Sequence, residues 1–292
     1  MSFASDVKNE ICRAELEDIC CVRAELAGII CFSAQITDRL IKINTENARV
    51  AERISELGVH LYKLGVEIEA RESGIYSVKI SGADVLKILR DMRLATVPIR
   101  IDKEISRREC CKRSFVRGAF LGGGSICAPQ KGYHMEFVTS HYALCRDFSS
   151  VLEYFGITPK IAERKSNYVF YIKDSEQISD LLAVVGAHNK MMEFLNIKIE
   201  KEIRNETNRR VNCENANSEK CAGAAVAQTH AILLIKQKLG LENLPPRLES
   251  IARVRLELPE ATLTDLAREL GITKSGANHR MRRLIKIANE IK

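Results

Sequence analysis

The sequence lacks any hydrophobic run long enough to cross a membrane. A transmembrane helix needs roughly 18 or more consecutive apolar residues, and no such run occurs in the 292-residue chain. The N-terminal segment MSFASDVKNEI carries acidic residues early and has no apolar core of the kind that a secretory signal requires. We therefore expect a cytoplasmic protein without a membrane partner.

The sequence also lacks the cysteine spacing of a local zinc site. Of the ten cysteines, Cys20 and Cys21 are adjacent, Cys110 and Cys111 are adjacent, and no pair has a gap of about two to four residues. Because nothing directs export, disulfides are not expected either. We predict reduced, mostly buried thiols that pack as small hydrophobic side chains, with a redox or adventitious metal role as the alternative. No metal ion and no cofactor is predicted.

A strong overall charge is missing as well. The net charge is +7, but residues 1–197 hold 27 basic and 26 acidic residues, a balance of only +1. Residues 247–292 hold ten basic and six acidic residues, a balance of +4. Phosphate contacts release counterions and supply much of the affinity of a protein for DNA, so a DNA-binding surface needs a positive excess. The positive excess lies in the C-terminal part of the chain, so we expect the DNA-binding surface there.

One short stretch is present twice. Residues 26–34 read LAGIICFSA and residues 116–124 read VRGAFLGGG, about ninety residues apart, and each is followed by the same order of hydrophobic runs. A glycine in mid-helix, such as Gly28 or Gly118, costs up to about 1 kcal/mol relative to alanine and usually marks the close approach of another backbone. Two such helices packed together would form the pseudo-twofold axis of a duplicated domain.

These stretches resemble the LAGLIDADG motif of homing endonucleases, whose paired motif helices join two half-domains. In that family the acidic residue in the eighth position of each motif binds the divalent metal that drives phosphodiester hydrolysis. The eighth positions here are Ser33 and Gly123, and neither offers the carboxylate oxygen that Mg²⁺ prefers. The resemblance implies a retained scaffold without catalytic residues, hence no enzyme. A displaced carboxylate from Glu25, Asp38 or Glu136 is the alternative.

The periodicity of the apolar residues predicts a duplicated α+β fold. Period-two runs predict strands at residues 39–45, 66–70, 76–80, 133–139 and 169–173. Runs with a period of three to four predict helices at residues 1–17, 20–32, 47–64, 83–92, 142–155 and 175–185. The expected product is a LAGLIDADG-type αββαββα domain with pseudo-twofold symmetry and four-stranded, or nearly four-stranded, sheets.

An all-α helix-turn-helix domain is predicted to follow. The expected bounds are 1–197 for the duplicated domain, with half-domains of about 1–105 and 106–197, then 198–221 for a linker and 222–292 for the helix-turn-helix domain. The linker is predicted because this segment is rich in asparagine, whose side chain competes for backbone hydrogen bonds and favours a helix that frays.

The stretch TLTDLARELGITKSGANHRMRRL has the helix-turn-helix pattern. Thr262 and Thr273 are placed to cap the two helices, the first in a capping-box arrangement with Asp265, and Gly271 is placed in the turn. The predicted core residues are Leu263, Leu266, Ala267, Leu270, Ile272, Ala277, Met281 and Leu284. The alternative is a helical bundle whose basic face is merely solvated.

This packing leaves one face of the second helix free for DNA. The residues predicted to meet base edges in the major groove are Lys274, Ser275, Asn278, His279 and Arg282. Those better placed for phosphates are Arg280, Arg283 and Lys286. The segment also resembles region 4 of bacterial sigma factors, a resemblance of fold that does not identify the sequence that is bound.

In this order the parts resemble the sporulation regulator WhiA family. The resemblance rests on the opening MSFASDVKNE, the segments CCVRAELAGII, RGAFLGGGS and NRRVNCENAN, and the end ITKSGANHRMRRL. It implies a sequence-specific regulator of transcription that binds double-stranded DNA at the nucleoid and is connected with cell division, chromosome segregation and, in some members, sporulation. An RNA polymerase sigma factor or another regulator is the implied protein partner. The alternatives are an interaction scaffold for such a partner and a residual endonuclease.

Overall fold

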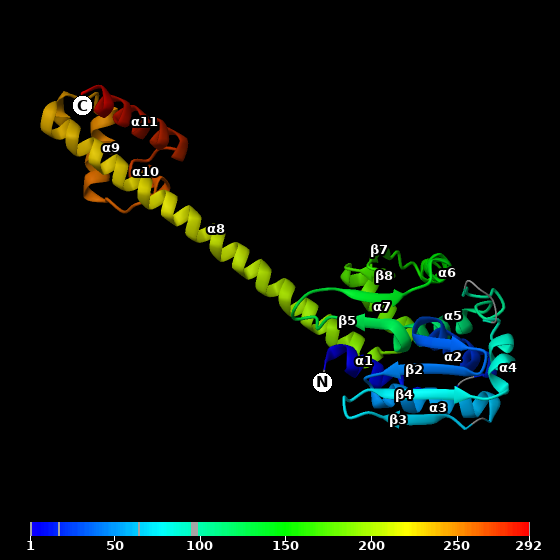
Figure 1. The fold of residues 1–292 in the computed structure, drawn as a ribbon. Helices are drawn as coiled ribbons and strands as arrows, with labels where there is room; N and C mark the ends of the chain where they lie inside the picture. The colour runs from blue at the N-terminus through cyan, green and yellow to red at the C-terminus, as the bar shows by residue number, and fades with distance from the viewer. Residues whose placement is uncertain (1, 17, 64, 95–98, 292) are drawn as a thin grey trace. The chain divides into compact units, whose positions relative to one another are not determined.

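The computed structural model describes residues 2–16, 18–63, 65–94 and 99–291. The chain forms two compact units, Met1–Lys201 and Glu202–Lys292, and the colours of Figure 1 follow the chain through each of them. No helix in the described part of the chain is both long enough and apolar enough to span a membrane.

The larger unit contains the same motif twice, after a short first helix α1 (Phe3–Ile11). The first copy consists of α2 (Ile19–Ser33), β1 (Ala34–Thr37), β2 (Leu40–Thr45), α3 (Ala48–Tyr62), β3 (Glu67–Ala70), β4 (Tyr76–Ser81) and α4 (Asp84–Asp91). The second consists of α5 (Glu109–Gly123), β5 (Gly124–Ile126), β6 (Met135–Thr139), α6 (Tyr142–Glu153), β7 (Lys160–Arg164), β8 (Asn167–Ile172) and α7 (Ser175–Val185). The predicted αββαββα duplication is confirmed.

Each copy folds into a four-stranded antiparallel sheet. The strand orders are β1-β2-β4-β3 and β5-β6-β8-β7, so the two sheets have the same topology. Three strands were not predicted. β1 and β5 follow their helices without a break and have only four and three residues, too few to show a period. β7 lies at the edge of its sheet and is exposed at four of its five positions, so it shows no alternation of burial.

The prediction of a first helix that reaches residue 17 is wrong, because α1 ends at Ile11. Its buried stripe of Phe3, Val7 and Ile11 ends at the same residue. Beyond it Cys12, Ala14 and Leu16 are only half-buried, and tertiary packing supplies most of the stability of a short helix. The Lys8 ammonium donates to the carbonyl of Leu121 in the second copy at 3.1 Å, so α1 bridges both copies.

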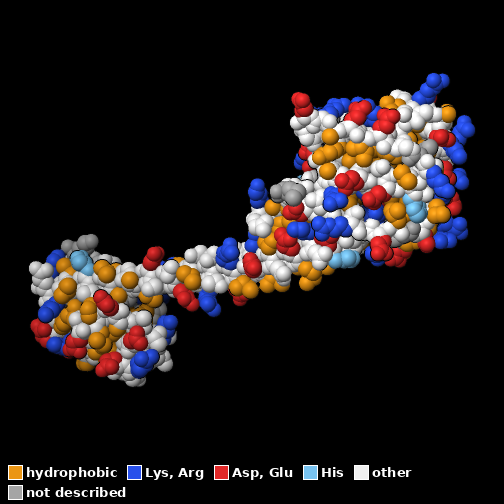
Figure 2. Space-filling model, turned by 90° about the horizontal axis from the view of Figure 1, so that it is seen from below, with side chains coloured by type: hydrophobic (Ala, Val, Ile, Leu, Met, Phe, Trp, Pro, Cys, Tyr) orange, Lys and Arg blue, Asp and Glu red, His pale blue; other side chains and the backbone are white. Residues whose placement is uncertain are grey.

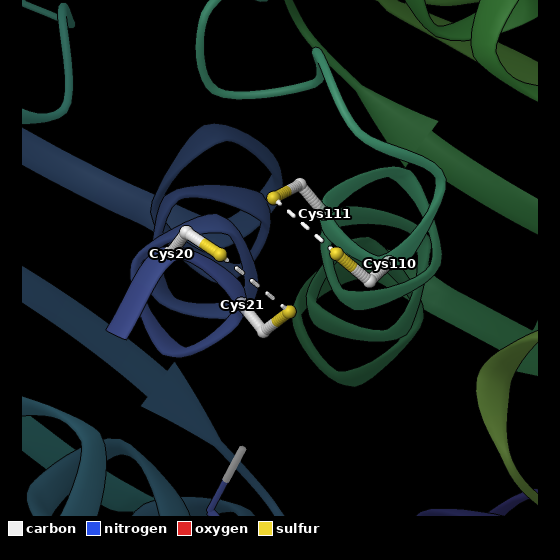
Figure 3. A group of neighbouring side chains, drawn as sticks. All are labelled: Cys20, Cys21, Cys110 and Cys111. Carbon is white, nitrogen blue, oxygen red and sulfur yellow. Dashed lines mark hydrogen bonds between the residues drawn. The ribbon is translucent and has the colours of Figure 1, made fainter. Parts of the chain in front are cut away.

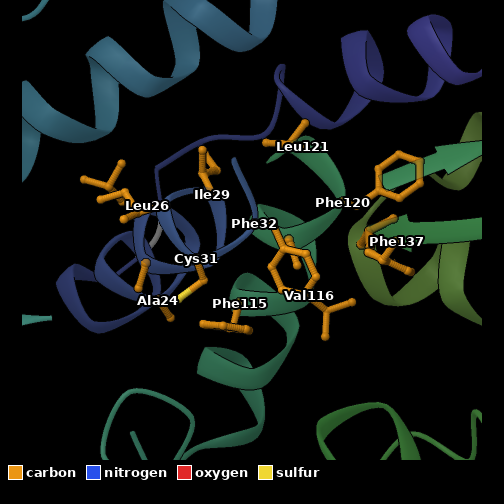
Figure 4. Close-up of a cluster of buried hydrophobic side chains, with 14 of the residues drawn as sticks. Ala24, Leu26, Ile29, Cys31, Phe32, Phe115, Val116, Phe120, Leu121 and Phe137 are labelled. Carbon is orange, nitrogen blue, oxygen red and sulfur yellow. The ribbon is translucent and has the colours of Figure 1, made fainter. Parts of the chain in front are cut away.

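The motif helices α2 and α5 pack backbone to backbone. A β-carbon on Gly28 would lie 2.3 Å from the carbonyl oxygen of Phe115, and one on Gly118 would lie 1.9 Å from that of Glu25. The predicted close approach at these glycines is therefore confirmed. Figure 4 shows buried side chains of the two helices that surround this contact. The Phe32 ring lies 4.8 Å from that of Phe148 in the second copy, so the two copies share one core.

A buried ion network also joins the copies. The Arg53 guanidinium donates to both carboxylate oxygens of Glu25, at 2.8 and 3.1 Å, and Arg117 on α5 donates to the same carboxylate at 3.5 Å. The exposed fractions of Glu25, Arg53 and Arg117 are 2%, 3% and 8%. A buried carboxylate needs such partners because desolvation of an unpaired charge is costly.

Helix α8 (His188–Lys238) contradicts the prediction of a fraying linker at residues 198–221, because it is continuous through this segment. Residues 202–224 are all exposed, so the asparagine side chains have access to water. The many Glu, Lys and Arg residues of the segment are good helix formers. The predicted domain bounds stay predictions.

The smaller unit continues with a 3₁₀ turn (Leu241–Asn243) and three helices, α9 (Pro246–Glu257), α10 (Leu263–Glu269) and α11 (Lys274–Glu290). Its own core is formed by side chains of α8 and of these helices.

Candidate nucleic-acid interface

Helix α11 buries one narrow stripe, has half-buried residues beside it and exposes its opposite face. The buried residues are Ala277, Met281, Leu284 and Ala288, spaced as one face of a helix requires. They pack in one core with Leu266 and Ala267 of α10 and Ile251 of α9. The predicted inward faces of both helices are thus confirmed.

The local signals that begin the two helices are also present. Thr262 and Asp265 form a reciprocal capping box at the start of α10. The Thr273 hydroxyl accepts from the Gly276 N–H at 3.1 Å at the start of α11. Between the helices Gly271 has φ +63°, a left-handed conformation that glycine adopts without a steric cost. Sequence-local chemistry therefore fixes where α11 begins.

The structure brings the eight predicted DNA-contacting residues together on α11. The side chains of Lys274, Ser275, His279, Arg282, Arg283 and Lys286 are exposed, and those of Asn278 and Arg280 are half-buried. By helical periodicity Ser275, Asn278, His279, Arg282, Arg283 and Lys286 share the face opposite the buried stripe, which we call the outward face. Lys274 and Arg280 lie at its two edges.

Few of these charges are neutralised within the protein. Lys286 lies 3.9 Å from a Glu290 carboxylate oxygen, which is the one ion pair of this set within the described part of the chain. Arg280 donates to the backbone carbonyl of Arg247 at 3.4 Å, which turns its guanidinium toward the start of α9. The outward face therefore keeps its positive charge available for an anionic partner.

Arg255 supports this unit from within and was not predicted. Its exposed fraction is 1%, and its guanidinium donates to Gln228 Oε1 of α8 at 2.8 Å and to the Leu258 carbonyl at 3.4 Å. It also donates to the Ala261 carbonyl, so it holds the α9–α10 turn against α8. Burial lowers the pKa of Arg255. The available signal was its position one helical turn after Ile251, on the apolar face of α9.

The two sheets carry further basic side chains, and two of these are paired with acids. Lys79 on β4 lies 2.6 Å from a Glu69 carboxylate oxygen, and Arg164 on β7 lies 3.8 Å from a carboxylate oxygen of Glu136. Basic and acidic side chains are also mixed over the visible face of the larger unit in Figure 2. Such a surface has little net attraction for phosphate.

The C-terminal ends of the motif helices hold no acidic pair. Ser33 Oγ donates to the Ile29 carbonyl in its own helix at 2.7 Å. A β-carbon on Gly123 would lie 2.8 Å from the Val138 carbonyl oxygen and 3.2 Å from Phe32, so this position is closely packed. No group of three or more acidic, histidine or cysteine ligands lies here among the described residues.

The three alternative carboxylates lie in other settings. Glu25 is the buried acceptor of Arg53 and Arg117 described above. Glu136 Oε2 lies 3.0 Å from His134 Nε2. Asp38 is exposed in the turn between β1 and β2. The structure therefore does not bring these carboxylates together at the ends of the motif helices.

The opposite ends of α2 and α5 carry four cysteines. The Sγ atoms of Cys20, Cys21, Cys110 and Cys111 all lie within 4.8 Å of one another, and Figure 3 shows them between the two helices. Burial raises the pKa of Cys111 to about 12 and also raises that of Cys21. Burial acts in the same direction on Cys20, but hydrogen bonds with Cys111 and Cys21 and the Arg108 guanidinium lower its pKa.

Sequence reasoning missed this cluster because it considered local spacing alone. The usable signal was that the two Cys-Cys pairs lie ninety residues apart, which is the spacing of the repeat. All ten cysteines are free in this structure, and the reduced state of the thiols stays a prediction. The prediction that most are buried is wrong in part, since Cys127, Cys213 and Cys221 are exposed.

Comparisons with known proteins cover the whole chain. The WhiA N-terminal LAGLIDADG-like domain matches residues 19–95, the WhiA LAGLIDADG-like domain residues 112–204 and the WhiA C-terminal HTH domain residues 207–288. The "Probable cell division protein WhiA" of Alkaliphilus metalliredigens is 38% identical, with 99% of this chain and 98% of that protein covered. The protein of the same name from Clostridium novyi is 39% identical, with 100% and 99% covered.

One solved structure is similar over its full length. The crystal structure of full-length WhiA from Thermatoga maritima has a TM-score of 0.65 at 28% sequence identity, with 99% of each chain covered. A structure of the N-terminal LAGLIDADG domain of WhiA has a TM-score of 0.56 at 22% identity, with 65% of this chain and 96% of that chain covered. The second similarity supports the fold alone.

Proposed function

Because this chain belongs to the WhiA family, we propose that it is a sequence-specific DNA-binding regulator of transcription that acts in cell division. The observation that carries the proposal is the outward face of α11, which is basic, exposed and largely unpaired, on a helix-turn-helix scaffold. In this class of motif the second helix lies in the major groove and its N-terminal residues meet the base edges. The relatives named for cell division support the cellular role.

The proposal assigns two roles within the helix. Residues of its first turns and of the centre of the outward face read base edges, namely Lys274, Ser275, Asn278, His279 and Arg282. Residues on the flank and toward the C-terminal end contact phosphates, namely Arg280, Arg283 and Lys286. Arg and Asn are suited to the first role because they form two hydrogen bonds with guanine and with adenine, respectively.

A binding measurement tests these roles. Duplexes are selected from a random library by the full-length protein, and affinity is then measured by fluorescence anisotropy on a selected and on a scrambled duplex. Arg282→Ala and Asn278→Ala should each cost about 1–3 kcal/mol on the selected duplex and relax the preference at one position. Arg253→Ala is the matched control, because it removes one exposed positive charge from α9. Unchanged selectivity in both α11 variants would contradict the proposal and favour an interaction scaffold.

We further propose that the LAGLIDADG-like unit does not cut DNA. This is supported by Ser33 and Gly123 at the two metal-ligand positions of the motif and by the ion pairs that hold Glu25. The test is nicking of supercoiled plasmid with Mg²⁺ or Mn²⁺, in parallel with Glu25→Gln and Glu136→Gln. Metal-dependent cutting that either variant abolishes would contradict the absence of nuclease activity.

The finer biological roles belong to the same proposal. Location at the nucleoid and regulation of chromosome segregation and sporulation follow from DNA binding and family membership. A sigma factor of RNA polymerase or another regulator is the proposed protein partner. Mapping of the bound sites by chromatin immunoprecipitation, with and without Arg282→Ala, tests the target genes. If occupancy of the sites does not depend on Arg282, a protein partner recruits the chain to them instead.

A further inference from the structure

The four-cysteine cluster is assigned no role by the proposed function. Cys20 and Cys21 are the second and third residues of α2, and Cys110 and Cys111 are the second and third residues of α5. The Sγ atoms lie 4.0 Å apart in the first pair and 3.9 Å apart in the second. The duplication places these pairs face to face, because the N-terminal ends of the two motif helices meet there (Figure 3).

These separations are those of a mononuclear metal site. In a tetrahedral zinc site with Zn–S bonds of about 2.3 Å, the sulfur atoms lie about 3.8 Å apart. The four sulfurs of this cluster all lie within 4.8 Å of one another, so no separation exceeds the tetrahedral value by more than about 1 Å. An iron–sulfur cluster places bridging sulfides and several irons between its thiolates, which this space does not allow.

Disulfides fit the arrangement less well. Adjacent residues have Cα atoms about 3.8 Å apart, whereas a disulfide usually needs about 4.4 Å or more. Bonding within either Cys-Cys pair is therefore disfavoured, and only cross-helix bonds remain. Cys21 and Cys111 are buried, which protects them from oxidants, while Cys20 and Cys110 are half-buried and give an ion access.

The surroundings favour an anionic complex. A metal dication with four thiolates carries two negative charges. Both Cys-Cys pairs lie in the first turns of α2 and α5, where the positive ends of the helix dipoles stabilise negative charge. No side chain at Asp18 or Arg108, which precede the helices, accepts a hydrogen bond from the first turn as a cap. Arg108 adds a positive charge near Cys20.

We propose that Cys20, Cys21, Cys110 and Cys111 bind one zinc ion as a tetrathiolate site that joins the N-terminal ends of the two motif helices across the pseudo-twofold axis. The ion would be structural, since four protein ligands leave no position for a substrate. It would stabilise the duplicated unit at the end of the helix pair opposite to Ser33 and Gly123.

The test begins with the unmodified full-length protein, so it does not depend on a variant that folds. Metal analysis of protein purified under reducing conditions should find about one zinc per chain. Replacement by Co²⁺ should give the visible bands of a tetrahedral site and thiolate charge-transfer bands of tetrathiolate intensity. Protein without zinc that also fails to bind added Co²⁺, or peptide mapping that finds a Cys20–Cys111 or Cys21–Cys110 disulfide in freshly purified protein, would overturn the proposal.

Two double variants assign the ligands. Cys20→Ser with Cys110→Ser should abolish stoichiometric zinc, while Cys213→Ser with Cys221→Ser should retain it, because the latter residues are exposed on α8. Circular dichroism checks that both variants are folded. If the first variant is folded and keeps the Co²⁺ spectrum of the parent protein, the assignment is wrong.

Discussion

Two helix pairs of this chain differ in how much of their surface is exposed to solvent. In the pair α2 and α5, eleven of the fifteen residues of α2 are buried, and the backbones touch at Gly28 and Gly118. In the pair α10 and α11, only four of the seventeen residues of α11 are buried. A helix that is buried nearly all round has few side chains left to contact DNA or a partner protein. The difference indicates that the first pair holds the larger unit together and that the second presents a binding face.

The largest expected effect comes from the backbone contact of the first pair. Gly118→Ala would place a β-carbon 1.9 Å from the carbonyl oxygen of Glu25, so α2 and α5 must move apart. Overpacking of this kind typically costs about 1–3 kcal/mol. Scanning calorimetry of the full chain should show a lower transition temperature for the larger unit.

Gly223→Ala is the matched control for this substitution. Gly223 lies on α8, and no heavy atom lies within 4 Å of an added β-carbon. Alanine should stabilise the helix there by about 0.5–1 kcal/mol, because glycine loses more conformational entropy on folding. If both variants shift the transitions by the same amount in the same direction, the proposed dependence of the first pair on close backbone packing is wrong.

The same contrast explains which parts of the fold could be predicted. The motif helices, the longer strands and the helix-turn-helix follow from local signals: the repeated glycines, the alternation in LIKIN and YSVKI, and the caps at Thr262 and Thr273. β7 was not predicted, whereas β3 was, although both are exposed edge strands without an alternation of burial. The asparagine-rich composition of residues 198–221 predicts a break that the helix formers around the asparagines prevent, so α8 is continuous.

Residues whose roles depend on distant partners were not predictable in the same way. From the sequence alone Arg53 and Arg255 are expected to be exposed. The sequence does not show the oxygen atoms that accept hydrogen bonds from their buried guanidinium groups. The four cysteines come together only when the motif helices of the two copies pack against each other. The residues of α11 that are predicted to contact DNA, by contrast, were selected from one helix and its period, and six of the eight share its outward face while Lys274 and Arg280 lie at the edges.

The next prediction concerns the stability of the buried helix pair α2 and α5 at alkaline pH. Burial raises the pKa of Cys31 on α2 from about 9 to about 12, so the folded state keeps a proton that the unfolded state loses. The stability linked to this thiol is fully present below pH 9 and is lost as pH rises toward 12. The loss approaches about 1.4 kcal/mol per pH unit. Calorimetry between pH 8 and 10.5 should show a shallower decline for Cys31→Val than for the parent protein.

The cysteines of the smaller unit supply the comparison for this measurement. Cys213 and Cys221 are exposed, whereas Cys31 is buried. Cys213→Ser with Cys221→Ser should leave the pH dependence of both transitions unchanged. An equal slope for Cys31→Val and the parent protein would show that this thiol is not protected by its burial between the helices.

The smallest expected effect is on the salt dependence of DNA binding. For a phosphate contact, the slope of log affinity against log salt changes by about 0.9, so Arg283→Ala should reduce the slope by that amount and weaken binding to selected and scrambled duplexes alike. Lys42→Ala removes one charge from β2 in the larger unit, and no change of slope is expected because the basic charges of the sheets are balanced by acids. Equal reductions in both variants would mean that the sheets contact phosphate as well. The buried pair would then support a DNA-binding surface of its own, and the division between a packing pair and a binding pair would not hold.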